Sequence, residues 1–146
     1  MTASLATVLR AVVSESPLDV AEHAALVGCA EAGAVVTFAG VVRDHDDGRA
    51  VRELEYSGHP TAGRVLAEVA AQVAAGAPEG VRAIAVSHRI GPLAIGDVAL
   101  ACAVAAEHRA EAFAVCAELV DEVKRVLPIW KRQVFSDGTV EWVNSP

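Results

Sequence analysis

Two residues, Lys124 and Lys131, are the only lysines of the chain, and they lie seven positions apart in the segment KRVLPIWKR. The other ten basic residues are all arginines. Ammonium groups at just these two positions suggest that a compact, titratable amine is needed there. Two neighbouring ammonium groups lower each other's pKa, and a neutral amine can act as a base or a nucleophile. The alternative is a lysine that only complements the negative end of a helix dipole.

Arginine and histidine side chains follow two of the predicted strands. Arg43 comes directly after the apolar run 34–42, and its guanidinium can hold a phosphate or a carboxylate with two hydrogen bonds. His108 and Arg109 lie where the apolar run 98–106 meets the start of a helix, whose free amide groups attract anions. Ordinary polarity at a strand end is the alternative interpretation. Together with the lysines, these residues predict a local site for an anionic small molecule.

The segment 43–49 is polar and rich in turn-forming residues, with acidic side chains between Asp44 and Asp47. This composition invites comparison with a calcium loop. A calcium loop requires glycine at its sixth position, where this chain has Arg49, and it requires flanking helices, which the pattern does not predict. We therefore expect no metal site, and the acidic loop has no role that the sequence can assign.

Length and composition limit the possible partners. The 146 residues predict a single domain, 1–146, and the 53% hydrophobic but only 4% aromatic composition predicts a core of many small side chains. A net charge of −7 argues against nucleic acid as a partner, because that affinity needs many cations on one face. The uncharged apolar runs are about half the ~20 residues that span a bilayer, so no membrane association is expected.

Three cysteines, an odd number without a CxxC pair, occur in a chain that does not begin like a secretion signal. This pattern predicts reduced thiols and a cytoplasmic location. Cys102 lies in an apolar strand-like run and Cys116 on an apolar helix face, so we expect both to be small core residues.

Hydrophobic periodicity predicts an α+β (mixed α/β) fold with three helices. The run 34–42 is nearly continuously apolar, as in a buried central strand, and it is expected to form a hairpin-like pair with 51–56. Gly91 and Pro92 predict a turn, and Asp137-Gly138 predicts a C-terminal β-hairpin. The remaining strands are expected at 7–13, 81–87, 98–106, 129–135 and 139–143, and the helices at 19–30, 60–75 and 109–127.

Four blocks of sequence, in this order, resemble one protein family, the large, catalytic subunit of molybdopterin synthase. The resemblance covers most of the chain. The blocks are Gly33-Ala34-Val35-Val36-Thr37-Phe38 through Gly40-Val41-Val42-Arg43-Asp44, then His88-Arg89-Ile90-Gly91, then Ala106-Glu107-His108-Arg109, and finally Lys124 through Pro128-Ile129-Trp130-Lys131-Arg132.

The resemblance implies an α/β hammerhead-type fold and a homodimer that binds two copies of a small ubiquitin-like sulfur carrier, giving a heterotetramer. The carrier's C-terminal Gly-Gly thiocarboxylate would deliver sulfur to cyclic pyranopterin monophosphate, forming the dithiolene of molybdopterin. No cofactor is expected. By position, Lys124 and Lys131 match the family's two catalytic lysines. The positions that match substrate-binding residues are Val41, Val42, Arg43, His108, Arg109, Arg132 and Gln133.

One position departs from the family pattern: many members have an acid where this chain has Gln133. The role of a carboxylate at this position is therefore open, although an amide can still hydrogen-bond a substrate. Two other functions are compatible with the sequence. The basic pocket would bind a pterin or a carrier's tail without catalysis, or a cysteine persulfide would carry the sulfur. The positions of His88 and Arg89 suggest that they brace a turn or an interface outside the site.

Overall fold

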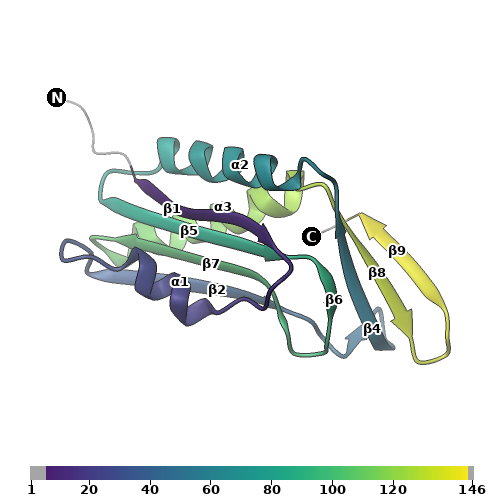
Figure 1. The fold of residues 1–146 in the computed structure, drawn as a ribbon. Helices are drawn as coiled ribbons and strands as arrows, with labels where there is room; N and C mark the ends of the chain where they lie inside the picture. The colour runs from purple at the N-terminus through teal and green to yellow at the C-terminus, as the bar shows by residue number, and fades with distance from the viewer. Residues whose placement is uncertain (1–5, 145–146) are drawn as a thin grey trace.

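The computed structural model describes residues 6–144, which form three helices and nine strands (Figure 1). The α+β class and the expected order of elements are confirmed, with two short strands added. In chain order the elements are β1 (Thr7–Ser14), α1 (Val20–Val27), β2 (Ala34–Val41), β3 (His45–Asp46), β4 (Arg49–Gly58), α2 (Ala62–Gly76), β5 (Val81–Arg89), β6 (Gly91–Leu93), β7 (Val98–Ala106), α3 (Arg109–Val126), β8 (Ile129–Phe135) and β9 (Val140–Asn144).

The first sheet has the strand order β1-β5-β7-β2 and is covered by helices on both faces (Figure 1). Strands β1 and β5 are parallel, whereas β7 is antiparallel to both of its neighbours. Helix α2 packs over β1 and β5, and helix α3 packs over β7 and β2. Helix α1 contacts β5, β7 and β2 on the opposite face. The central strands β5 and β7 are therefore buried on both sides.

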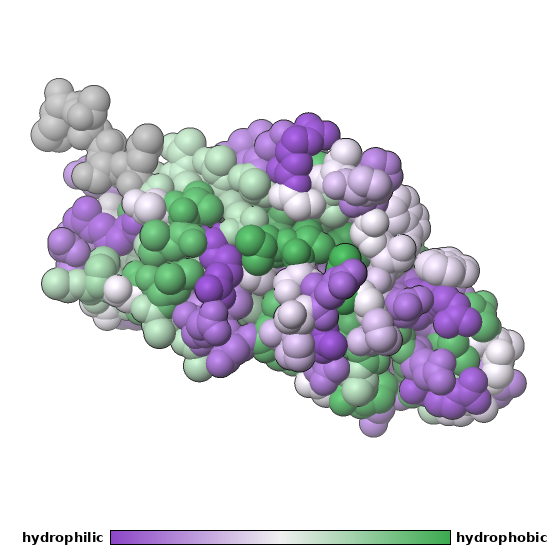
Figure 2. All heavy atoms as spheres, viewed as in Figure 1, coloured by the Kyte–Doolittle hydropathy of each residue, from purple (hydrophilic) through white to green (hydrophobic). Residues whose placement is uncertain are grey.

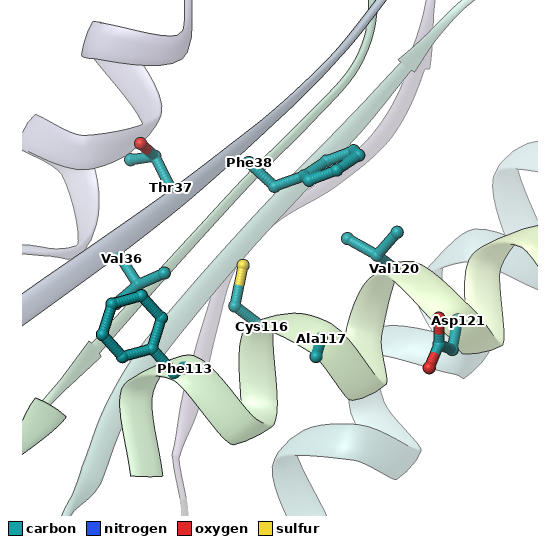
Figure 3. A pocket seen from close by; sticks show the side chains of 8 residues that line it. All are labelled: Val36, Thr37, Phe38, Phe113, Cys116, Ala117, Val120 and Asp121. Carbon is teal, nitrogen blue, oxygen red and sulfur yellow. The ribbon is translucent and has the colours of Figure 1, made fainter. Parts of the chain in front are cut away.

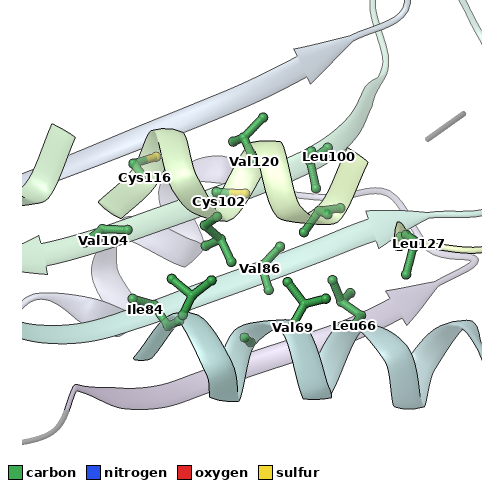
Figure 4. Close-up of a cluster of buried hydrophobic side chains, with 14 of the residues drawn as sticks. Leu66, Val69, Ile84, Val86, Leu100, Cys102, Val104, Cys116, Val120 and Leu127 are labelled. Atoms are coloured by element: carbon green, nitrogen blue, oxygen red, sulfur yellow. The ribbon is translucent and has the colours of Figure 1, made fainter. Parts of the chain in front are cut away.

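Side-chain size differs between the two faces of this sheet. On the face of α2 and α3, larger side chains such as Leu66, Ile84 and Val104 make the main core (Figure 4). On the face of α1, Val27 packs on alanines of β5 and β7, among them Ala85 and Ala103. Alternate residues of a strand point to opposite faces, so an alanine at every second position lets α1 approach the sheet closely. This explains the alanine-rich, aromatic-poor composition.

The second sheet has the strand order β3-β4-β8-β9, and β6 is also hydrogen-bonded to β4. It extends from one end of the molecule, where α3 ends and β8 begins (Figure 1). Strands β8 and β9 form the expected C-terminal hairpin. Figure 2 shows polar surface over much of this end, and apolar patches divided by a hydrophilic strip on the part of the molecule that carries β1 and α1.

Four expectations about local structure are wrong. The run 34–42 forms an edge strand, not a central one, and its outward side chains Val35 and Val41 are 43% and 48% exposed. It pairs with β7, whereas β4 pairs with β8, so the two do not form a hairpin. An apolar run does not specify its neighbours, because strand order depends on long-range packing. Gly91 and Pro92 belong to the short strand β6, and α1 ends at Val27 because Gly28 closes it.

None of the helices within residues 6–144 has the length and apolar character to cross a membrane.

Replacing a glycine by alanine is expected to have opposite effects on stability at two positions of the chain. A Cβ at Gly33 would lie 2.6 Å from the backbone oxygen of Glu107, whereas a Cβ at Gly63 on α2 would meet nothing within 4 Å. We expect Gly33→Ala to lower the free energy of unfolding by about 1–3 kcal/mol through overpacking. The control Gly63→Ala is expected to raise it by about 0.5–1 kcal/mol, because alanine favours a helix. Urea unfolding measures both, and a Gly33→Ala protein as stable as the wild type would contradict this reading of the contact.

Candidate active site

The two lysines come together where α3 ends and the second sheet begins. Lys124 lies in the last turn of α3, the helix ends at Val126, and Pro128 leads directly into β8, which carries Lys131. Partial burial of the ammonium group lowers the pKa of Lys124, and the positive charge of Lys131 lowers it further. The interaction of two charges weakens with distance, so this effect indicates that the two amines lie in the same region of the molecule. The proline break therefore brings both amines to one place.

A small pocket of about 60 Å³ lies beside Lys131. Tyr56 on β4 is opposite Lys131, and Leu54 is opposite Gln133, so the four side chains share one face of the sheet. The segment that follows β2 closes the pocket. Its lining residues are Val41, Val42, Arg43, His45, Asp46, Leu54, Tyr56, Lys131 and Gln133. The volume is about that of two water molecules, enough for one anionic group of a ligand but not for a whole pterin.

Asp46 is the acidic group of this pocket, and no sequence pattern assigned it there. Gln133 is only 2% exposed, and its Nε2 donates to Asp46 Oδ2 at 2.7 Å. Arg43 Nη2 donates to Asp46 Oδ1 at 3.2 Å. The hydrogen bond from Gln133 holds the pKa of Asp46 below its usual value, and the positive charges of Lys131, Arg43 and Arg49 act in the same direction. Asp46 is therefore an ionised carboxylate among cations.

Arg132 does not share the pocket with its neighbours. Successive residues of a strand point to opposite faces, and Arg132 is opposite Glu55 and Trp142, on the reverse side of the sheet from Lys131 and Gln133. The structure therefore does not bring Arg132 to the pocket that holds Lys131. Being next to Lys131 in the sequence does not place Arg132 in the same pocket, because adjacent side chains of a strand point to opposite faces of the sheet.

His108 and Arg109 lie at the opposite end of α3 from Lys124. At about 1.5 Å per residue, the helix separates Arg109 from Lys124 by roughly 22 Å along its axis. His108 is the N-cap residue of α3, and its side chain makes no capping hydrogen bond. One copy of the chain thus places the predicted phosphate-binding residues at two distant positions.

His88 lies near the C-terminal end of β5 and is fully buried. Its Nδ1 donates to the carbonyl of Arg89, and its ring packs edge-on against Tyr56 at 5.0 Å. Burial lowers the pKa of His88 to about 4, and the charge of Lys124 contributes, so the ring is neutral at physiological pH. His88 does not line the pocket, as expected, but its neutral ring supports Tyr56, which does line it. Its place on the same strand face as Ile84 and Val86 was the sequence signal for this burial.

An apolar groove of about 380 Å³ lies between β2 and α3 (Figure 3). Phe38, Phe113 and Val120 line it, and Asp121 is its one charged lining residue. Without a cation it does not suit an anionic ligand. Cys116 also faces the groove, but burial raises the pKa of its thiol, and the same holds for Cys102. Both cysteines are core residues, as the sequence predicted.

Among residues 6–144, no group of three or more His, Cys, Asp or Glu side chains is arranged to hold a metal ion.

Comparison with known proteins gives one consistent result. The family described as MoaE protein matches residues 13–126. The chain is 38% identical over 133 residues to the molybdopterin synthase catalytic subunit of Nostoc sp., an alignment that covers 90% of this chain and 80% of that protein.

Solved structures have the same fold. The molybdopterin synthase structure from Staphylococcus aureus superposes with a TM-score of 0.83 at 30% identity, covering 91% of this chain and 96% of that one. A complex of subunits 1 and 2 of molybdopterin-converting factor from Helicobacter pylori shares the fold at 17% identity, with a TM-score of 0.63, covering 97% of this chain and 90% of that one. By sequence and by fold, the chain belongs to the MoaE family of molybdopterin synthase catalytic subunits.

Proposed function

We propose that this chain is a sulfurtransferase that transfers sulfur from the C-terminal thiocarboxylate of a small carrier protein to cyclic pyranopterin monophosphate, forming the molybdopterin dithiolene. The observation that carries the proposal is that Lys131 lines an anion-sized pocket and that its charge lowers the pKa of Lys124, in a chain of this family. Both reactants are anions, and the pocket supplies cations in a protein of net charge −7.

The two amines have different roles in the proposed reaction. Lys131 and Arg43 line the pocket, so their charges stabilise the negative charge that develops when the thiocarboxylate sulfur reacts. Lys124 has a lowered pKa and a neutral histidine beside it, which favours the free amine as the group that accepts a proton or attacks. The proposed catalysis then depends on two amines in different surroundings, Lys124 partly buried and Lys131 in the pocket with Arg43.

A separate sulfur carrier would explain how this chain transfers sulfur without a reactive cysteine of its own. Cys102 and Cys116 are buried with raised pKa values, which disfavours a persulfide on either residue. An extended C-terminal tail can dock in a narrow pocket and bring the sulfur itself. The two-subunit complex from H. pylori supports a small-subunit partner. The three free cysteines are consistent with a protein that acts in the reducing cytoplasm.

We further propose that the working unit is a homodimer with two carriers and that His108 and Arg109 act in the partner's site. The roughly 22 Å between Arg109 and Lys124 prevents both from contacting one small substrate within one copy. In a two-fold dimer the same patch is used twice, so each site would receive Lys124 from one copy and Arg109 from the other.

Lys124→Ala is expected to reduce molybdopterin formation at least about a hundredfold, as for the loss of a general acid–base or nucleophilic group. The assay follows conversion of the pterin precursor with a thiocarboxylated carrier. Arg125→Ala is the matched control, because Arg125 is in the same helical turn but pairs with Glu122 on the surface. Neither residue belongs to the buried core, so stability should change by no more than about 0.5 kcal/mol. Undiminished turnover by Lys124→Ala would remove the proposed role.

Lys131→Met should shift the pH dependence of kcat. The charge of Lys131 lowers the pKa of Lys124, so its removal raises that pKa toward the ordinary lysine value of about 10.4. Because the neutral amine is the active form, kcat rises with pH, and the midpoint of the rise should move upward in Lys131→Met. An unchanged midpoint would show that the two amines do not interact during turnover.

Mixed dimers test whether each site is shared. We expect Lys124→Ala and Arg109→Ala to be inactive separately. After dissociation and random reassociation of an equal mixture, about a quarter of wild-type activity should return, since half of the dimers then contain one intact site. If Lys124 and Arg109 act within one copy, the mixture will stay as inactive as its components.

A further inference from the structure

The loop between β2 and β4 is folded into a fixed hairpin. Asp47 and Gly48 both have positive φ angles, 52° and 74°, as in the tight Asp-Gly turn that joins two antiparallel strands. The turn pairs β3 with the start of β4, so Asp46 is opposite Arg49. The acidic segment 43–49, to which the sequence assigned no role, therefore holds Asp46 in one position.

Arg49 anchors the other side of this hairpin. Its Nη2 donates to Glu141 on β9 at 2.7 Å, and its guanidinium lies over the ring of Phe135 at 3.7 Å. Asp46 itself receives the hydrogen bond of the buried Gln133. The hairpin is thus attached to the second sheet on both strands, and the Asp46 carboxylate cannot turn toward solvent without leaving the Gln133 amide unpaired.

The side chain of Arg43 lies largely in solvent and depends on a hydrogen bond for its orientation. Its side chain is 63% exposed, and among the hydrogen bonds of the described residues it contacts Asp46. An exposed ion pair of this kind adds little to stability. Its effect is geometric: it directs the guanidinium of Arg43 over the same pocket that Lys131 lines.

We propose that Asp46 is a positioning residue of the reaction, a single carboxylate that, held by Gln133, orients Arg43 and balances the positive charge of the pocket. The proposal deepens the proposed function and rests on it. The Gln133 amide and the Asp46 carboxylate are hydrogen-bonded at 2.7 Å. The proposal requires one of these two side chains, whichever it is, to be negatively charged and the other to be neutral. A second carboxylate would repel the first, and a second amide would leave the cations unbalanced.

The charge of Asp46 also makes a specific prediction about anions. Removing a carboxylate from a cationic pocket strengthens simple anion binding, yet it releases Arg43 from the orientation that the reaction uses. Asp46→Asn should therefore bind inorganic phosphate several-fold more tightly, while kcat falls about tenfold and KM does not rise. A loss of folded protein alone would leave the phosphate affinity of the remaining molecules unchanged.

Exchanging the two groups should restore the site. In Asp46→Asn/Gln133→Glu the asparagine amide donates to the new glutamate, its oxygen still accepts from Arg43, and the total charge is unchanged. We expect kcat within about threefold of wild type, whereas Gln133→Glu alone places two carboxylates together and loses more activity than Asp46→Asn. Asp47→Asn is the control, because it removes the same charge from the same turn outside the pocket lining and keeps a residue that tolerates positive φ.

The measurements are steady-state molybdopterin formation and calorimetric titration with inorganic phosphate on all four variants. If Asp46→Asn matches Asp47→Asn in both, or if the double variant is no better than the single ones, the positioning role is overturned. If the wild type forms no molybdopterin, the proposed function fails instead. The phosphate titration then still decides whether the Asp46 charge is felt in the pocket.

Discussion

The site depends on forcing two like charges together at the junction of α3 and β8. Repulsion between ammonium groups opposes this arrangement, so the junction must be fixed by something stronger. Val123, Leu127 and Ile129 are nearly inaccessible to solvent and belong to the main core. Burying three aliphatic side chains contributes on the order of 1.5–3 kcal/mol each, which exceeds the repulsion of two partly screened charges. Pro128 then prevents the helix from continuing, and β8 with Lys131 begins directly after it.

The surroundings of the amines divide into a neutral side and a charged side. Behind Lys124 lie His88, neutral because it is buried, and Cys102, whose raised pKa keeps it a thiol. Beside Lys131 lie Arg43 and Asp46, a cation and its counter-charge. The low polarity of the first group favours the neutral form of Lys124. This difference follows from the position of the site between the core of the helix-covered sheet and the open second sheet (Figure 1).

The small volume of the pocket is consistent with a site that is completed by other chains. About 60 Å³ holds one anionic group, whereas the proposed reaction brings together a pterin phosphate and a protein tail. In the proposed dimer, the missing contacts would come from another copy, and His108 and Arg109 at the N-terminal end of its α3 are one source. A catalytic site divided among subunits links activity to assembly, because free subunits cannot start the reaction.

The sequence by itself determined which elements form and where the amines lie along the chain. Helical spacing followed by Pro128 placed Lys124 in a last helical turn, and the Asp137-Gly138 turn gave the C-terminal hairpin. Such features are local, and local periodicity and turn chemistry are what a sequence records directly. The tertiary structure alone decided that the run 34–42 is an edge strand, that Arg132 faces away from Lys131, and that Asp46 meets Gln133. Each of these depends on strand pairing between residues far apart in the chain, which packing selects and no short segment encodes.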